Sequence, residues 1–296
     1  MEGTKLERIL CPVDFSEFSS RAYAYASSLA HHCGAKLFVQ HVIETCQYPC
    51  SSFAPTVDDY EEFWRAIRAQ SQEQLRSFIA GHTANHVETE SVTCEGVAAD
   101  CILTFANQHE VNLIVMGTHG VRGFERLMLG SATERVLRKA ACPVLAVPKL
   151  PPDLVASMTA GNDVRVRQIL ACADFSDSSK EAVNFAISVA EDYDAELTVV
   201  NVLEAVSAAG CAEETAIAYK HLDELFPRQT GLGSRIRTAV RIGRPFREIS
   251  KLALEIRADV AIMGARGRNS VDAVFFGSTT YRVVQSGVCP VLSVRD

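Results

Sequence analysis

A glycine fingerprint occurs twice in this chain of 296 residues, and it constrains the fold more than any other feature. In each copy a Gly-x-x-Gly motif follows an apolar run typical of a buried strand, and nine residues separate it from a Gly-Ser pair at the start of a predicted helix. Glycines placed in this way form a cradle of backbone N–H groups suited to a phosphate chain. The two copies are Gly117-Thr-His-Gly120 with Gly130-Ser131, and Gly264-Ala-Arg-Gly267 with Gly277-Ser278.

The rest of the chain repeats as well. Residues 9–44 are identical to residues 169–204 at 15 of 36 positions, and residues 117–147 match residues 264–294 at 12 of 31. The offset falls from 160 to 147 between these blocks, so the first copy carries 13 extra residues between Glu44 and Gly96. Copies of roughly 140 residues have the usual size of one α/β domain. We predict two tandem domains, over residues 1–149 and 167–296, joined by a linker over residues 150–166.

Each copy alternates short apolar segments with segments of helical periodicity. This alternation predicts an α/β fold in which each copy is an open five-stranded, mainly parallel sheet with helices on both faces. Ligands of such sheets bind beyond the carboxyl ends of the strands, where the strand order reverses. If the first and fourth strands are neighbours, Asp14 lies beside the Gly117 loop, and Asp174 lies beside the Gly264 loop.

Composition argues against several classes of protein. A net charge of −7 and an isoelectric point of about 5.7 argue against a nucleic-acid binder, which is normally basic. The sequence has no apolar stretch of 18 residues, the length expected of a membrane span. The segment before the first predicted strand lacks the apolar region of a signal peptide. We expect a cytoplasmic protein.

The 10 cysteines do not indicate a disulfide framework, because a chain of this size in a reducing compartment does not need one. Several lie in or beside apolar elements and are expected to act as small hydrophobes: Cys11, Cys101, Cys142, Cys172 and Cys289. An alternative for another group is a zinc site, formed by Cys46 and Cys50 with His82 and His86. Neither spacing matches a zinc ribbon or finger, so we favour loop thiols and surface histidines.

These motifs resemble those of the universal stress protein family in its tandem two-domain form. The resemblance covers both copies and rests on Asp14-Phe15-Ser16 after a short apolar strand, on the Cys-Pro-Val-Leu tail, and on the glycine pattern, which is the family's ATP-binding signature. It implies Rossmann-like domains of the adenine nucleotide alpha-hydrolase-like type. It also implies binding of ATP or AMP. We expect Mg²⁺ on the phosphates and assign no residue as a metal ligand.

Carried over position by position, the resemblance implies a role for each matching residue. Asp14 and Asp174 would face the adenosine, and the backbone around Val42 and Val202 would border the adenine. Ribose and phosphates would be held by Gly117, Gly120, Gly130 and Ser131 in the first copy and by Gly264, Gly267, Gly277 and Ser278 in the second. The further residues expected to line the two sites are Pro12, Met116, His119, Arg122, Ala132, Met263 and Thr279.

The second copy departs from the family pattern more than the first. Three positions of the first copy are replaced: Pro12 by Cys172, Arg122 by Asn269, and Gly123 by Ser270. We therefore expect the first copy to bind nucleotide more tightly.

The family's final strand commonly pairs across a dimer interface, and each copy here ends in such a strand. An unpaired apolar edge strand must be covered or paired. We expect the copies to pair internally, and whole chains to form a homodimer through terminal strands or domain faces.

Local structure is an alternative explanation for the same residues. Ser131 with Glu134 three residues later has the pattern of a capping box. Asp14 and Asp174 are suitable caps for the helices that follow them. The strand-end glycines have a second explanation as well, because they permit a tight exit from the strand.

No catalytic constellation is evident in the sequence. It has no P-loop, kinase glycine loop, nucleophile elbow or zinc helix. His119 is a polar phosphate neighbour rather than a general base in this interpretation, because the second copy has Arg266 there. We expect at most slow ATP hydrolysis. The leading hypothesis is a stress or signalling module whose affinity for unidentified protein partners depends on bound nucleotide. The alternatives are a nucleotide-free scaffold and a weak ATPase.

Overall fold

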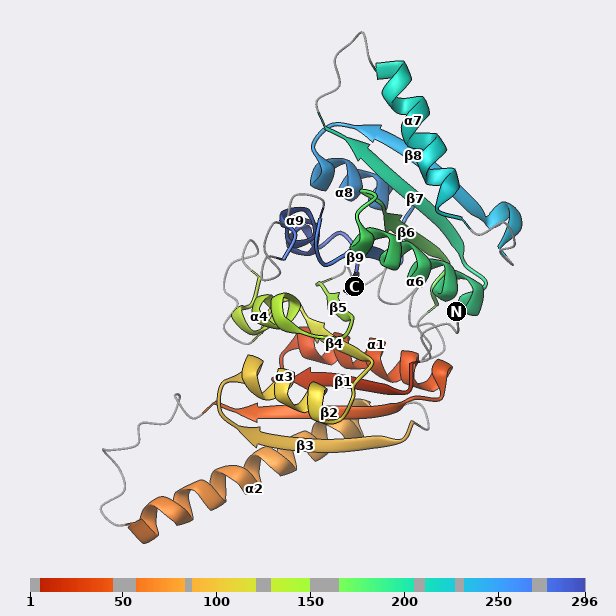
Figure 1. Ribbon diagram of the computed structural model, residues 1–296. Helices are drawn as coiled ribbons and strands as arrows, with labels where there is room; N and C mark the ends of the chain where they lie inside the picture. Colours follow the sequence, from red (N-terminus) through yellow and green to blue (C-terminus); the bar gives the residue numbers. More distant parts are fainter. Residues whose placement is uncertain are drawn as a thin grey trace.

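The structure, a computed structural model, describes residues 6–44, 57–82, 87–120, 129–149, 165–204, 211–226, 232–267 and 276–295. In these ranges the two copies form one ten-stranded sheet with the order β3-β2-β1-β4-β5-β10-β9-β6-β7-β8 (Figure 1). The first copy contributes β1 (Arg8–Val13), β2 (Lys36–Ile43), β3 (Thr89–Glu95), β4 (Leu113–Gly117) and β5 (Val144–Val147). The second contributes β6 (Gln168–Cys172), β7 (Glu196–Leu203), β8 (Ile236–Ile242), β9 (Val260–Gly264) and β10 (Val291–Val294).

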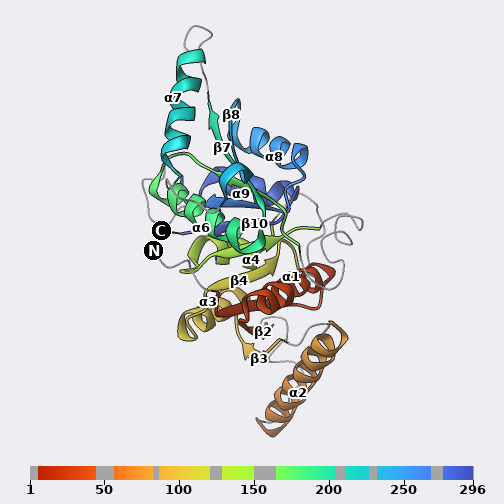
Figure 2. The same ribbon diagram turned by 90° about the vertical axis from the view of Figure 1, so that its right-hand side faces the viewer.

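Helices cover both faces of this sheet. One layer consists of α1 (Glu17–Cys33), α2 (Val57–His82), α6 (Asp177–Tyr193) and α7 (Cys211–Glu224). The other consists of α3 (Ala98–Gln108), α4 (Ser131–Lys139), α8 (Pro245–Glu255) and α9 (Ser278–Ser286). Helices α2 and α7 lie at opposite ends of the molecule (Figure 2). The predicted α/β fold, with five parallel strands in each copy, is confirmed.

Two apolar cores result from the alternation of side chains along the strands. Consecutive residues of a strand point to opposite faces of a sheet. Ile9 and Cys11 accordingly join the core under α1, whereas Leu10 between them joins the core under α3 and α4. Each core contains residues of both copies, so the two copies are stabilised together.

The terminal strands join the copies. β5 pairs with β10 in antiparallel register, with Leu145 opposite Leu292. The predicted internal pairing of the copies is therefore confirmed. Each terminal strand has a neighbour on both sides, since β5 also pairs with β4 and β10 with β9. The expected homodimer therefore cannot use these strands, and of the two routes that we predicted only the domain faces remain.

Serine caps explain where the first helix of each copy begins. The Ser16 hydroxyl accepts a hydrogen bond from Ser19 N, and the Ser176 hydroxyl accepts one from Ser179 N. The alternative explanation, that Asp14 and Asp174 cap these helices, is wrong, because the caps lie two residues further along. A left-handed residue ends each helix, Gly34 for α1 and Asp194 for α6.

The described residues test only some of our expectations about the cysteines, the linker and the zinc alternative. Cys11, Cys172 and Cys289 are buried as expected, but Cys101 and Cys142 are only half-buried. The thiols whose positions the structure describes are all free. Linker residues 150–164 lie outside the described residues, as do three members of the zinc alternative: Cys46, Cys50 and His86. None of the described helices has the length and hydropathy required to cross a membrane.

The strand seam provides a stability test. Leu292 is 6% exposed and pairs with Leu145 across the seam, so we expect Leu292→Ala to lower the free energy of unfolding by about 2–4 kcal/mol. Leu254 on α8 is 61% exposed, and we expect Leu254→Ala to change the free energy of unfolding by less than about 0.5 kcal/mol. Urea unfolding of the whole chain measures both values, and equal effects would contradict the role assigned to the seam.

Candidate functional site

The carboxyl ends of the central strands bring the predicted loops together in each copy. β1 pairs with β4, and β6 pairs with β9. A Cβ added to Gly120 would lie 2.5 Å from Asp14 Oδ2, and one added to Gly267 would lie 3.2 Å from Asp174 Oδ2. The predicted neighbourhood of each aspartate and its glycine loop is therefore confirmed.

An Asp-Phe-Ser turn leads from the first strand of each copy into the first helix. Asp14 Oδ1 accepts hydrogen bonds from Ser16 N at 3.1 Å and from Ser16 Oγ at 2.6 Å. Phe15 between them has a φ of +63°, a left-handed conformation that bulky residues rarely adopt. Asp174-Phe175-Ser176 repeats these bonds, with a φ of +66° at Phe175. The aspartate thus holds the capping serine, and its Oδ2 faces the glycine loop.

In each copy, a side chain of the second strand donates a hydrogen bond to the backbone carbonyl of the residue before the aspartate. His41 Nδ1 donates to Val13 O at 2.9 Å, and Asn201 Nδ2 donates to Ala173 O at 2.7 Å. The two residues correspond in the repeat but have different chemistry. Burial of the imidazole lowers the pKa of His41, an effect that its bond to Val13 O opposes.

Close packing explains the glycines at the strand ends. A Cβ added to Gly117 would lie 2.8 Å from Phe18 Cβ and 3.0 Å from the Phe18 carbonyl carbon, and one added to Gly264 would lie 2.9 Å from Ser178 Oγ. Real Cβ atoms essentially never approach other atoms so closely. The approach of helices α1 and α6 to the strands is therefore sufficient reason for these two glycines.

The glycines that precede α4 and α9 have no such reason. Gly130 and Gly277 have φ values of −58° and −59°, which any residue adopts. Among the described residues, an added Cβ would meet nothing closer than 3.4 Å at Gly130 and 3.5 Å at Gly277, which is ordinary contact. Neither the backbone conformation nor packing against these residues requires glycine at the two positions. Close approach of a ligand to the backbone is another physical reason for glycine, and the contacts among the described residues leave it open.

The capping-box explanation of Ser131 is wrong. Gly130 is the N-cap residue of α4, no side chain of the described residues caps this end, and Ser131 is exposed. Glu134 instead pairs with Arg138 at 2.8 Å. Ser278 has the same exposed place at the start of α9. Both serines therefore lie beside the first N–H groups of a helix, where anions are stabilised.

Two threonines that our sequence analysis missed hold these helix ends in place. Thr133 Oγ1 donates to Gly117 O at 2.8 Å, and Thr280 Oγ1 donates to Gly264 O at 2.9 Å. Both bonds are buried, and both tie the start of a helix to the end of the preceding strand. Thr133 and Thr280 occupy equivalent positions of the repeat, at the offset of 147 residues. This identity is the sequence signal that could have revealed them.

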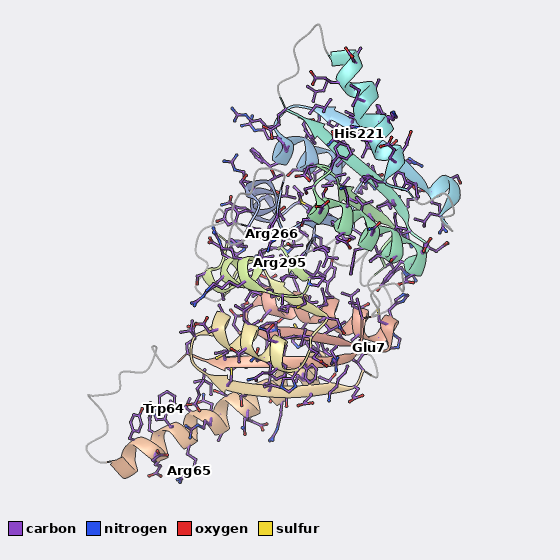
Figure 3. The ribbon with its side chains drawn as sticks, viewed as in Figure 1. Glu7, Trp64, Arg65, His221, Arg266 and Arg295 are labelled. Carbon is purple, nitrogen blue, oxygen red and sulfur yellow. The ribbon has the colours of Figure 1, made fainter. Side chains whose placement is uncertain are left out.

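A cavity of about 970 Å³ opens at the site of the second copy. Its polar lining includes Glu204 and Glu214. His221 and Arg266 of the glycine loop line it as well, and both are labelled in Figure 3. Every residue predicted for the second site lines it: Asp174, Val202, Met263, Gly264, Gly267, Gly277, Ser278 and Thr279.

The first-copy residues occupy the corresponding places. The Thr118 hydroxyl lies 2.9 Å from His119 Nδ1, and the His119 ring packs on Phe18 at 5.0 Å, so local contacts orient this imidazole. Arg122 and Gly123 lie outside the described residues, as do their counterparts Asn269 and Ser270. The other predicted residues are Pro12 on β1, Val42 on β2, Met116 and Gly117 on β4, Asp14 and Gly120 in the loops, and Gly130, Ser131 and Ala132 at the start of α4.

Comparison with known proteins agrees with this architecture. The profile of the universal stress protein family matches residues 5–148 and again residues 165–295. The chain belongs to this family. A universal stress protein of Methanocaldococcus jannaschii is 33% identical over 145 residues, which are 48% of this chain and 82% of the relative. One from Bacillus subtilis is 31% identical over 144 residues, 47% of this chain and 97% of the relative.

Solved structures that align with both copies of this chain share the fold. The crystal structure of a universal stress protein from Archaeoglobus fulgidus has a TM-score of 0.66 and 21% identity, and the match covers 100% of this chain and 99% of that one. A functionally unknown protein from Pseudomonas aeruginosa has a TM-score of 0.64 and 16% identity, covering 99% and 93%. The tandem arrangement is therefore that of known proteins.

The buried threonine bonds can be tested by stability. Thr280→Val removes the donor to Gly264 O, and we expect it to lower the free energy of unfolding by about 1–3 kcal/mol, the cost of a buried unsatisfied carbonyl. Thr104 on α3 is exposed, and Thr104→Val should change the free energy of unfolding by less than about 0.5 kcal/mol. Urea unfolding compares the two, and a Thr280→Val protein as stable as the control would contradict the role of the bond.

His41 predicts a pH dependence of stability. Because its pKa is lower in the folded chain, the unfolded chain binds a proton there more readily, and stability is lost as pH falls through about 6.5. In His41→Asn the amide donates the same bond without titrating, as Asn201 does. We expect the urea midpoint of His41→Asn to fall less than that of the parent between about pH 7 and pH 5. Asn201→His should fall more steeply, and an unchanged slope in both variants would count against this account.

Proposed function

We propose that this chain is an adenine-nucleotide-binding stress-response or signalling module. ATP or AMP binds at the carboxyl ends of the strands in each copy, and the affinity for protein partners depends on the bound nucleotide. The observation that carries this proposal is the pair Gly130 and Gly277, because neither their conformation nor any contact with the described residues requires glycine there. Both lie at helix N-termini, where a phosphate approaches backbone N–H groups.

The second-copy cavity suits a nucleotide in size and in the order of its lining. Its 970 Å³ lies at the upper end of the range for small-molecule sites. The start of α9, with Ser278 and Thr279, would hold the phosphates, and the charge of Arg266 would oppose theirs. Asp174 would accept from the ribose hydroxyls, and the Val202 backbone would border the adenine. Bound Mg²⁺ would neutralise phosphate charge, with its ligands supplied by the phosphates and water.

Turnover is not the main activity in this proposal. The histidine of the first glycine loop, His119, is held by Thr118 and corresponds to Arg266 in the second copy, which cannot act as a base. This loop position therefore provides no base that the two sites share. We expect bound ATP to be hydrolysed slowly at most, and the protein to work in the cytoplasm as a nucleotide-dependent binding partner.

Glycine variants test the two sites separately in the full chain. Calorimetry of the parent should show two ATP sites, with the first-copy site tighter. Gly130→Val and Gly277→Val should each remove one site or weaken it at least about tenfold (about 1.4 kcal/mol). Gly81→Val in α2 is the matched control, because a Cβ there meets no atom within 4 Å. Gly120→Val is less suitable, since its Cβ would displace Asp14.

Two outcomes would overturn the assignment. Parent-like ATP affinity in both Gly130→Val and Gly277→Val would show that nucleotide does not approach these glycines. Freshly purified parent protein can also be quenched in acid and analysed for nucleotide. If it contains none and binds none in solution, the chain is instead the nucleotide-free interaction scaffold.

A further inference from the structure

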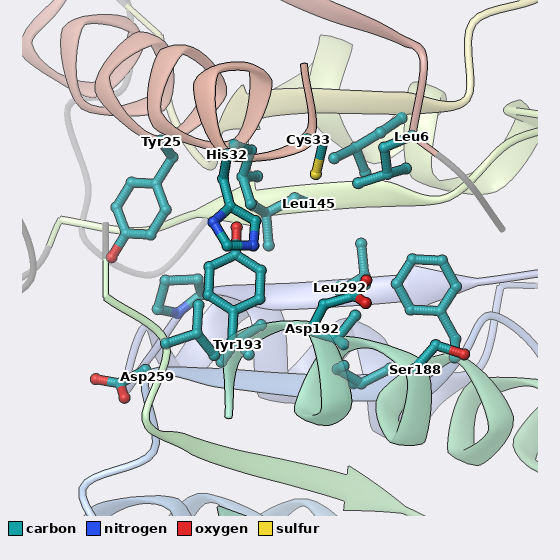
Figure 4. A pocket seen from close by; sticks show the side chains of 18 of the residues that line it. Leu6, Tyr25, His32, Cys33, Leu145, Ser188, Asp192, Tyr193, Asp259 and Leu292 are labelled. Atoms are coloured by element: carbon teal, nitrogen blue, oxygen red, sulfur yellow. The ribbon is translucent and has the colours of Figure 1, made fainter. Parts of the chain in front are cut away.

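A second cavity lies between the two copies, away from the nucleotide sites. It has a volume of about 680 Å³ and is lined by residues of both copies (Figure 4). Leu113 and Val260, the first residues of β4 and β9, line it, as do Leu6 and Val166 before β1 and β6. These are the amino ends of the strands, whereas the glycine loops follow the carboxyl ends. The two kinds of site therefore share no lining residue in the second copy.

The walls of this inter-copy cavity on both sides of the strand seam are mainly apolar. Leu145 and Leu292 of the strand seam form part of its wall, and Leu29 of α1 with Phe185 and Val189 of α6 form another part. All five side chains belong to the shared core or pack against it. A concave, mostly apolar site of this volume accepts the hydrocarbon body of a small molecule.

The rim of the cavity is acidic. Glu191, Asp192 and Asp259 line it, and no lysine or arginine is among the described residues that do. His32 stacks on Tyr193 at 4.0 Å with 20° between the rings, which brings the last turns of α1 and α6 together there. Helix C-termini carry partial negative charge and attract cations. The rim therefore complements a positive group.

The fold itself does not require this charge. At the repeat offsets, Glu191 and Asp192 correspond to His31 and His32, which build the same last helical turn in the first copy. Asp259 Oδ2 accepts hydrogen bonds from the backbone N–H groups of Arg167 and Gln168. In the first copy, the amide oxygen of Asn112 accepts the same pair of bonds from Glu7 and Arg8. A residue without negative charge thus suffices for each structural role.

The acidic charge reaches the side chains inside the cavity. Burial raises the pKa of the Cys33 thiol, and the carboxylate of Asp192 raises it further. Burial likewise raises the pKa of Tyr25, with Asp259 as the next contribution. Both groups line the cavity, and both therefore resist ionisation to an anion.

We propose that the inter-copy cavity binds a small amphiphile that has an apolar body and a protonated amine as its head group. The body occupies the apolar wall at the seam, and the ammonium lies at the rim near Glu191 and Asp192. This site does not depend on nucleotide binding, so either proposal can fail without the other.

Three probes with one hydrocarbon chain and different head groups test this with the full-length parent protein. Calorimetry with octylamine, octanol and octanoate should give affinities in that order, with octylamine at least about tenfold tighter than octanoate. Added salt should reduce the preference for the amine, because the rim is exposed and its charges are screened. Octanoate binding as tightly as octylamine would overturn the proposal, as would the absence of octylamine binding.

Variants test the contributions of the acidic rim and of the apolar wall to binding separately. The double variant Glu191→Gln with Asp192→Asn should abolish the preference for octylamine over octanol and leave octanol affinity unchanged. Glu181→Gln is the matched control, an exposed acid on the same helix that does not line the cavity. Val189→Trp should fill the cavity and weaken octanol at least about tenfold, while circular dichroism confirms its fold. Unchanged octylamine affinity in the rim variant, or unchanged octanol affinity in a folded Val189→Trp, would contradict the site.

Discussion

The antiparallel pairing of β5 with β10 is the interaction on which the rest of the structure depends. Without it each copy would expose an apolar edge strand, the kind of edge that promotes aggregation. With it, two five-stranded sheets become one, and each of the two cores extends across both copies. The same seam brings α1 against α6, so the contact that stabilises the copies also forms the wall of the cavity between them.

Most of this architecture could be predicted from the sequence, because the same motifs and the same alternation of elements occur in both copies. Asp14 and the glycine loop are far apart in the chain, yet the alternation of strands and helices was enough to expect β1 beside β4. The helix cap could not be predicted in the same way, because both Asp14 and Ser16 are good capping residues. The structure places the left-handed Phe15 between them and makes Ser16 the cap.

The structure also divides glycines that look equivalent in the sequence into two physical classes. Gly117 and Gly264 are fixed by the approach of a helix backbone, which no local pattern reveals. Gly130 and Gly277 have ordinary dihedral angles and room for a Cβ atom among the described residues. Only three-dimensional packing separates a glycine required by the fold from one that leaves space beside a helix N-terminus. For this reason the second pair, rather than the whole motif, supports a ligand.

A tandem chain differs from a symmetric dimer at the axis that relates its halves. In a homodimer any residue placed at the axis appears on both sides, so an acidic group there would face its own copy and be repelled. Joining the copies in one chain removes this restriction. His32 can stack on Tyr193, a residue that corresponds to Cys33, and acids can gather on the second copy opposite histidines of the first. The charge of the inter-copy cavity is thus a property that duplication within one chain makes available.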